Sequence, residues 1–403
     1  MSTYLEFWKN MLLTVFKGSQ QFYKWIGLLA FLCLIGLVAY SQQFDKGLVV
    51  TNLADEVSWG AYIANFTFLV GVAAAAVLLV VPAYVYKNEA VKEIVILGEI
   101  LAVTAIVMCM LFIMVDMGRP DRFWHVIPFI GRLNFPSSIL AWDVIVLNGY
   151  LALNLHIPGY LLYKYYLGQK PSDKYYRPLV FISIFWAVSI HTVTAFLYSG
   201  LGGRAFWNSA ILAPRFLISA FAGGPALLIL IFYCINKYYT HMKVKEEVFV
   251  LLKKIAAVAF PINLFLLFCE IFKEFYTDSA HVASARYLFI GLHGHHMLVP
   301  YIWFAILCGI GTTAVFVTPK WRNNEKYLLP ACVLGFIGIW IEKGMGLIIP
   351  GFVPSPLGSI VEYNPSIYEF FICLGIWAFG ALLFTLMAKA ALDIISGRLR
   401  ASN

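Results

Sequence analysis

The chain has 403 residues, of which 61% are hydrophobic and only 12% are charged, and its mean hydropathy is +0.81. Soluble domains carry about twice that share of charged residues, so the composition excludes a soluble fold of this size. The net charge is +8, but the Lys and Arg side chains lie in short connections between apolar segments and form no stripe, which argues against nucleic acid as a partner. The composition therefore predicts an all-α polytopic membrane protein.

Ten apolar segments are long enough to span a bilayer, whose hydrocarbon core of about 30 Å needs about 20 helical residues. In chain order we expect spans near 25–40, 57–86, 94–115, 137–163, 178–199, 214–235, 249–276, 287–317, 327–349 and 366–392. Pro residues in the 351–358 stretch predict an extended, stiff loop before the last span.

Small residues occur at 71–76 in the second span and at 223–226 in the sixth, where they would let helices approach closely. We expect two four-helix bundles flanked by two further helices, which divides the chain into five parts. They are a cytoplasmic N-terminal segment (1–24), a first helix with its outer loop (25–56), a first bundle (57–199), a second bundle (214–349), and a Pro-rich loop with the last helix and a cytoplasmic tail (350–403).

Lys and Arg residues are unequally divided between the two sets of alternate connections. The set that includes both termini holds 17 of them and the opposite set holds 7. Because cytoplasmic loops are enriched in Lys and Arg, we expect both termini in the cytoplasm and the chain in the inner (cytoplasmic) membrane. The opposite loops carry the unusual sequence, among them 116–125, 199–215 and 276–286, so function is expected at the periplasmic face.

The seven cysteines all stand singly within apolar segments, with no C-x-x-C pair. This pattern predicts neither an iron–sulfur cluster nor a zinc site in the chain. A dihaem cytochrome would need histidine pairs near both membrane surfaces, and the inner half offers only His156. We therefore expect no haem, no iron–sulfur cluster and no metal in this chain.

Ionisable residues inside predicted spans are costly and by default functional. At 1.5 Å per residue, one group of them forms a layer in the outer third of the membrane, made up of Asp143, His191, Glu270, His293, Glu342 and Lys343. Any single one could be structural, since a buried histidine can bond a carbonyl and Lys343 can neutralise Glu342. The whole layer, beside aromatic side chains, is what quinone chemistry needs: protonatable groups for two protons and apolar walls for the ring.

Several segments resemble the NrfD/PsrC (polysulfide reductase membrane subunit) family. They are the run 57–75 that begins Val-Ser-Trp-Gly, the run 116–124 that reads Asp-Met-Gly-Arg-Pro-Asp-Arg-Phe-Trp, and Ala-Trp-Asp at 141–143. The segments 191–200, 206–215 and 354–363 look most like the ten-helix branch of that family, which includes DsrP of the DsrMKJOP complex, HmcC and QrcD.

The resemblance implies a membrane subunit without cofactors of its own that binds menaquinone near the periplasmic face, in the first bundle. The residues expected to bind the quinone are Trp59, Tyr62, Asn65, Arg119 and Trp142. The residues expected to exchange protons with it are His191, Asp143 and Asp116. His191 is the first candidate, because this chain has Tyr or Asn where some members of the family have a His in the first core helix. Arg119 has an alternative role, since it could equally pair with a neighbouring carboxylate and fix its loop.

The resemblance also implies partners. The first is a periplasmic four-cluster ferredoxin-like iron–sulfur subunit. The DsrP branch implies three further partners: a multihaem cytochrome c, a haem b membrane subunit and a cytoplasmic iron–sulfur protein. It also implies a role in sulfur or sulfate metabolism. In that branch Glu270, His293 and Glu342 are expected to form part of a proton path.

Two other functions fit part of the sequence. A secondary transporter also has many helices and buried charges, but transporters tend to bind at the midplane on broken helices, whereas the polar layer here lies toward one face. A structural anchor for an iron–sulfur subunit would leave electron transfer intact when His191 or Asp143 is replaced. The sequence favours the quinone-interacting subunit of a respiratory oxidoreductase complex, which is not catalytic alone.

Overall fold

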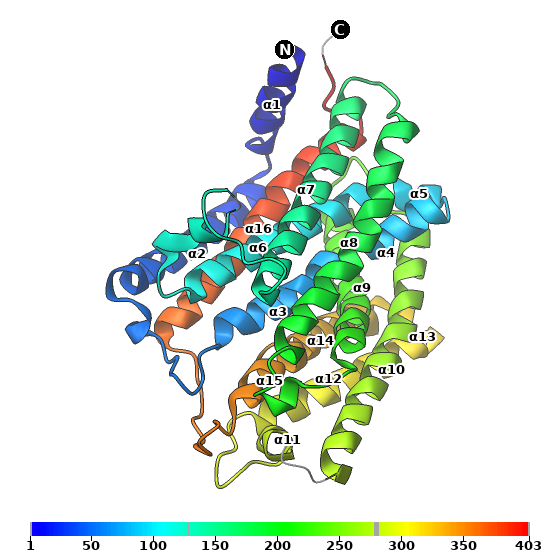
Figure 1. Ribbon diagram of the computed structural model, residues 1–403. Coiled ribbons are helices and arrows are strands. Elements are labelled where there is room, and N and C mark those ends of the chain that lie inside the picture. Colours follow the sequence, from blue (N-terminus) through cyan, green and yellow to red (C-terminus); the bar gives the residue numbers. More distant parts are fainter. Residues whose placement is uncertain (1, 128, 278–281, 402–403) are drawn as a thin grey trace.

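The computed structural model describes residues 2–127, 129–277 and 282–401, and in this part of the chain all the long elements are helices (Figure 1). Ten of them are long and apolar enough to cross a membrane, which confirms the predicted multi-pass, all-helical fold. They are α2 (Gln20–Lys46), α3 (Ala61–Ala74) with α4 (Val77–Val80) and the π-helical η2 (Val81–Val85), α6 (Val95–Asp116), α7 (Ile139–Tyr166), α8 (Asp173–Ser199), α9 (Leu212–Tyr238), α10 (Glu246–Thr277), α12 (Val299–Val317), α14 (Glu325–Lys343) with α15 (Met345–Ile348) and η5 (Ile349–Phe352), and α16 (Ile367–Ile395).

Short helices fill the connections. Since the ten spans alternate in direction along the chain, α1 (Ser2–Val15), α5 (Glu89–Lys92) and α13 (Pro319–Arg322) lie on the same side as both termini. The opposite end, called the distal end below, carries η1 (Leu48–Val50), η3 (Pro120–Val126), η4 (Ala205–Trp207) and α11 (Val282–Phe289).

The long helices pack in three groups. One group is α3, α6, α7 and α8, a second is α9, α10, α12 and α14, and α2 packs along α16, which in turn contacts α6. The first two groups meet where α9 packs against both α8 and α3, and α14 also contacts α3. Here the small-residue patches face each other, because a Cβ added at Gly224 would lie 2.6 Å from the Ala75 Cβ, and one added at Gly71 would lie 3.9 Å from the Ala220 Cβ.

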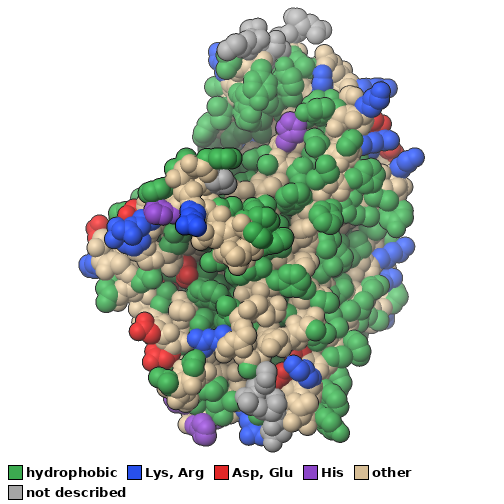
Figure 2. All heavy atoms as spheres, in the orientation of Figure 1, with side chains coloured by type: hydrophobic (Ala, Val, Ile, Leu, Met, Phe, Trp, Pro, Cys, Tyr) green, Lys and Arg blue, Asp and Glu red, His purple; other side chains and the backbone are tan. Residues whose placement is uncertain are grey.

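The surface agrees with a membrane setting. Figure 2 shows hydrophobic side chains over much of the visible face, with Lys and Arg gathered mainly near its borders. Many large apolar side chains are exposed along α2, α8 and α10, among them Phe31, Phe185 and Phe265. Lipid tails would cover such side chains at no hydrophobic cost.

The predicted span near 287–317 is wrong at its beginning. Helix α11 ends at Phe289, a polar turn follows, and α12 starts only at Val299. Within the turn Gly291 and Gly294 have φ values of +101° and +90°, which glycine adopts without strain and which break the helix. His293 lies in this turn and is exposed, so it does not belong to the layer of buried ionisable groups.

The contact between α2 and α16 depends on a pair of glycines. A Cβ added at Gly36 would lie 2.6 Å from the Cα of Gly375, so Gly36→Leu should force the helices apart. Overpacking of this kind costs about 1–3 kcal/mol, and we expect the thermal midpoint of the detergent-purified protein to fall by several degrees. Gly27→Leu is the matched control, because a Cβ there meets nothing within 4 Å. Equal midpoints for the two variants would contradict this packing.

Candidate functional site

A buried polar cluster lies between α7 and α8, in their distal halves. The Asp143 carboxylate is 3% exposed and accepts a hydrogen bond of 2.9 Å from the Thr194 hydroxyl. His191 precedes Thr194 by three residues on α8, so both side chains lie on one face of that helix. His191 is 1% exposed; its Nδ1 lies 3.2 Å from the Ala187 carbonyl oxygen, and its Nε2 has no hydrogen-bond partner among the described residues.

Tyr198 and Asp116 extend this cluster toward α3 and α6. The buried Tyr198 hydroxyl bonds the Thr67 hydroxyl of α3. Asp143 and Asp116 both act electrostatically on Tyr198. Asp116 is the last residue of α6, and its Oδ1 is buried without a hydrogen-bond partner in the described part of the chain. We call Asp116, Asp143, His191, Thr194 and Tyr198 the first polar cluster.

Tyr62 and Asn65 bond to other helices. The Tyr62 hydroxyl donates to Oε1 of Gln43 on α2, at 2.6 Å. The Asn65 side-chain oxygen accepts from the indole nitrogens of Trp340 and Trp377, each at 2.9 Å. These bonds connect α3 to α2, α14 and α16, so both residues stabilise the helix arrangement.

The other residues expected to bind the quinone lie nearer the distal surface. Trp59 stacks on Trp207 with ring centroids 5.8 Å apart and also contacts the Tyr198 ring. Trp142 is 39% exposed and donates to the Pro136 carbonyl, so its ring is not beside the Asp143 carboxylate.

Arg119 forms an ion pair within its loop. Its guanidinium lies 2.9 Å from the Asp121 carboxylate, and both side chains are exposed. The hydrogen bond from Arg119 lowers the pKa of Asp121. The structure thus shows the loop-fixing contact that the sequence left open as the alternative for Arg119.

A second polar cluster lies among α9, α10 and α14. The Arg215 guanidinium pairs with Glu270 and, at 2.9 Å, with Glu342. Lys343 Nζ lies 3.3 Å from the Glu342 carboxylate, and the Asn263 amide donates to that carboxylate at 3.0 Å. All five side chains are buried, and two cations balance two carboxylates. This balance makes a charged group in a membrane interior tolerable.

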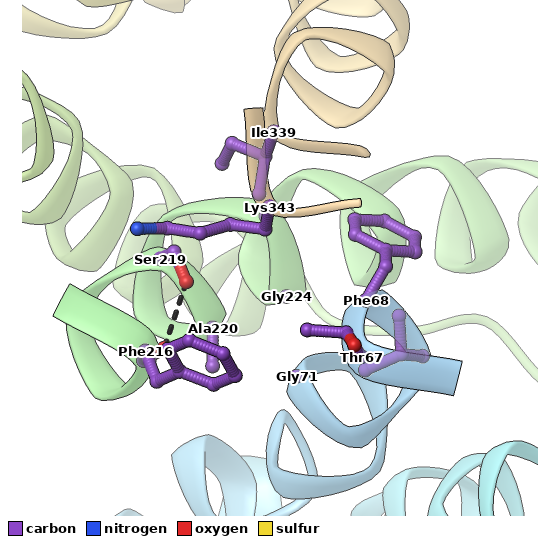
Figure 3. A pocket seen from close by; sticks show the side chains of 11 residues that line it. Thr67, Phe68, Gly71, Phe216, Ser219, Ala220, Gly224, Ile339 and Lys343 are labelled. Atoms are coloured by element: carbon purple, nitrogen blue, oxygen red, sulfur yellow. Dashed lines mark hydrogen bonds between the residues drawn. The ribbon is translucent and has the colours of Figure 1, made fainter. Parts of the chain in front are cut away.

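Two small cavities accompany these clusters. One lies between α3, α9 and α14, and its lining includes Thr67, Phe216, Ser219 and Lys343 (Figure 3). The other lies near the distal end of α10 beneath α11; Arg215 and three carboxylates, Glu270, Glu274 and Glu342, line it together with apolar side chains.

Sequence reasoning found some members of these clusters and missed others. It selected Asp143, His191, Asp116, Glu270, Glu342 and Lys343, which are ionisable residues within or at the edge of apolar runs. It missed Thr194, Tyr198, Arg215 and Asn263 within the clusters, and Glu274 beside the second one. The signal for Glu274 is its place four residues after Glu270 on one helix. Arg215 falls both in the outer segment 199–215 and at the start of the predicted span 214–235, and it lies in the first turn of α9. Among the described residues no three His, Cys, Asp or Glu side chains are grouped so that they could hold a metal ion.

Comparison with known proteins places the chain in a family. The family model described as "Polysulphide reductase, NrfD" matches residues 49–354. The chain is 24% identical to the "Hdr-like menaquinol oxidoreductase integral membrane subunit" of Archaeoglobus fulgidus, across 92% of this chain and 93% of that protein. It is 23% identical to the "Menaquinone reductase, integral membrane subunit" of Nitratidesulfovibrio vulgaris, across 87% of each chain. It is 22% identical to one of the selenate reductase subunits of Mesobacillus selenatarsenatis, across 90% of this chain and 92% of that protein.

Removal of Arg215 should leave two buried carboxylates without their main cation. Breaking a buried ion pair in this way costs about 3–5 kcal/mol, so we expect Arg215→Met to lower the membrane yield and the thermal midpoint sharply. The double variant with Glu270→Gln should recover part of the loss. The control is Arg177→Met, which breaks an exposed pair with Asp173 at 2.7 Å that is worth about 0–1 kcal/mol. If the Arg215→Met protein were as stable as this control, the Arg215 charge would not be needed to balance the two buried carboxylates.

Proposed function

The chain belongs to the polysulphide reductase NrfD family, and we propose that it is the quinone-reacting membrane subunit of a respiratory oxidoreductase complex. In this proposal the first polar cluster binds the head group of menaquinone or menaquinol, and a periplasmic iron–sulfur subunit at the distal end exchanges electrons with it. The larger share of Lys and Arg in the connections on the side of the termini supports a periplasmic distal end.

The observation that carries the proposal is that two buried atoms, His191 Nε2 and Asp116 Oδ1, have no hydrogen-bond partner among the described residues. Buried polar atoms are nearly always hydrogen-bonded, and an unpaired one is costly away from water. The Ala187 carbonyl can only accept, so the hydrogen of a neutral His191 lies on Nδ1 and the lone pair on Nε2. A quinol hydroxyl supplies the donor that both atoms lack, so these residues fit the ligand.

The residues of the cluster then have distinct roles. His191 Nε2 accepts a proton from one quinol hydroxyl as the ring gives up its two electrons, and Asp116 is the acceptor available to the other. Thr194 holds the Asp143 carboxylate in place by the bond of 2.9 Å. Trp59 and Trp207 contact the Tyr198 ring and each other, so aromatic side chains adjoin the cluster.

The finer features of the proposal rest on the relatives. Two of them carry menaquinol or menaquinone in their names, which supports menaquinone as the quinone. The resemblance to the DsrP branch supports a role in sulfur or sulfate metabolism, with a four-cluster iron–sulfur subunit as the first partner. A multihaem cytochrome c, a haem b membrane subunit and a cytoplasmic iron–sulfur protein would complete that complex.

His191→Ala should remove the proton acceptor and slow electron delivery from a menaquinol analogue by about 10²- to 10⁴-fold. Asp143→Asn should also impair it. The measurement follows reduction of the co-purifying iron–sulfur subunit by optical or EPR change. His156→Ala is the matched control, because this exposed histidine lies in the half of α7 toward the termini and bonds the Tyr175 hydroxyl at 2.7 Å. Unchanged rates in intact His191→Ala and Asp143→Asn complexes would instead favour a structural anchor.

A further inference from the structure

The segment 354–363, which carries part of the family resemblance, lies in the connection between η5 and α16 at the distal end. This connection is bonded to the second bundle near both of its ends. The Val353 carbonyl accepts a hydrogen bond of 2.6 Å from the Ser284 hydroxyl, and the Glu362 carboxylate accepts one of 2.9 Å from the Met297 backbone N–H. The connection is therefore fixed on α11 and on the turn before α12.

Tyr363, at the end of this segment, caps the first turn of α3. Its side chain is 2% exposed, and its hydroxyl accepts a hydrogen bond of 2.9 Å from the Ala61 N–H. The first N–H groups of a helix have no partner within the helix, and the N-cap residue Gly60 has no side chain to supply one. A Cβ added at Gly60 would lie 2.3 Å from the Tyr363 ring, so glycine leaves the room for this cap.

A buried carboxylate fixes the Tyr363 hydroxyl in turn. The hydroxyl donates its hydrogen to Oε1 of Glu369, which is fully buried in the first turn of α16. The other oxygen of Glu369 accepts from the backbone N–H groups of Asn52 and Ser366, each at 2.9 Å. Because its hydrogen is directed at Glu369, the Tyr363 hydroxyl keeps a lone pair toward the start of α3.

The residue next to this cap is Trp59, which directly precedes Gly60. The Trp59 ring lies edge-on to the ring of Tyr198 in the first polar cluster, with centroids 5.9 Å apart. It also lies 5.9 Å from the ring of Phe352, the residue at which η5 ends and the connection begins. Both ends of the connection therefore reach Trp59, one by a ring contact and the other, Tyr363, through the backbone at Gly60.

We infer that Tyr363 is a positioning residue of the quinone site. The inference rests on the proposed function, in which the first polar cluster binds the quinone head group. Tyr363 fixes the start of α3, so that the Trp59 ring stays beside Tyr198 and forms an apolar wall for the quinone ring. Such a wall contributes equally to the binding of the ground state and the transition state, so its displacement raises KM and leaves kcat nearly unchanged.

The test uses the whole complex, purified through a tag on this chain and assayed with a soluble naphthoquinol. Tyr363→Phe keeps the ring beside Gly60 and removes both hydrogen bonds of the hydroxyl. It should raise the KM for the quinol and the Kd of a quinone-analogue inhibitor about tenfold, with kcat within about twofold of the wild type. Structural damage would instead lower kcat, because fewer molecules are active, and would leave KM unchanged.

Two further variants show whether Tyr363 acts through Trp59. Trp59→Leu should raise KM at least as much, and the addition of Tyr363→Phe to it should change KM by less than about twofold. Tyr239→Phe is the matched control, because the Tyr239 hydroxyl also donates to a carboxylate of α16, that of Asp393 at 2.8 Å, but at the opposite end of the helix. This control should keep the KM of the wild type.

The outcomes separate this inference from the function on which it rests. A wild-type complex that neither oxidises the naphthoquinol nor reduces the naphthoquinone overturns the proposed function. If the wild type is active and Tyr363→Phe keeps its KM, or loses only kcat, the positioning role alone is overturned. An equal effect of Tyr363→Phe with and without Trp59→Leu also overturns this role, because Tyr363 would then act independently of Trp59.

Discussion

The arrangement of this protein depends on how the few polar side chains of α3 are paired. Almost every residue of this helix is buried, in a chain whose surroundings offer no water to an unpaired group. Tyr62 bonds α2, Asn65 bonds α14 and α16, and Thr67 bonds α8. Three side chains, each at a different rotation about the helix axis, thus fix α3 against both bundles and the flanking pair.

Because α3 also meets α9 through glycine and alanine, it brings the two bundles close together. The small residues let the backbones approach, and they leave a cavity where their absent side chains would lie. Close packing and a small water-sized space are consequences of the same residues. The charges of the second cluster are balanced within it, so its carboxylates can stay buried near this space.

The spans could be predicted from the sequence because length and apolar character alone determine them. The same count predicts the depth of Asp143, His191, Glu270 and Glu342, and all four side chains are buried. The direction in which a side chain points could not be predicted from this count, since neighbouring residues on a helix differ in direction by about 100°. Trp142 is exposed while Asp143 is buried, and no pattern in the sequence distinguishes them.

Other differences have local causes. His293 was placed in the membrane because its flanks are apolar, but two glycines with positive φ turn the chain there. The resemblance predicts Tyr62 and Asn65 as quinone-binding residues; the structure adds hydrogen bonds from both to helices far away in the sequence, which no local pattern indicates. The role of Arg215 could not be predicted from its own segment, because the carboxylates with which it pairs lie on two other helices.

The most direct test of the central claim is photo-crosslinking of an azido-menaquinone analogue to the purified complex, followed by mapping of the labelled peptides. A quinone at the first polar cluster should label peptides from the distal halves of α7 and α8 and from the end of α6, and an excess of unlabelled quinone should compete. Labelling confined to α10 and α12, or to another subunit, would contradict the assignment of quinone chemistry to His191, Asp116 and Asp143.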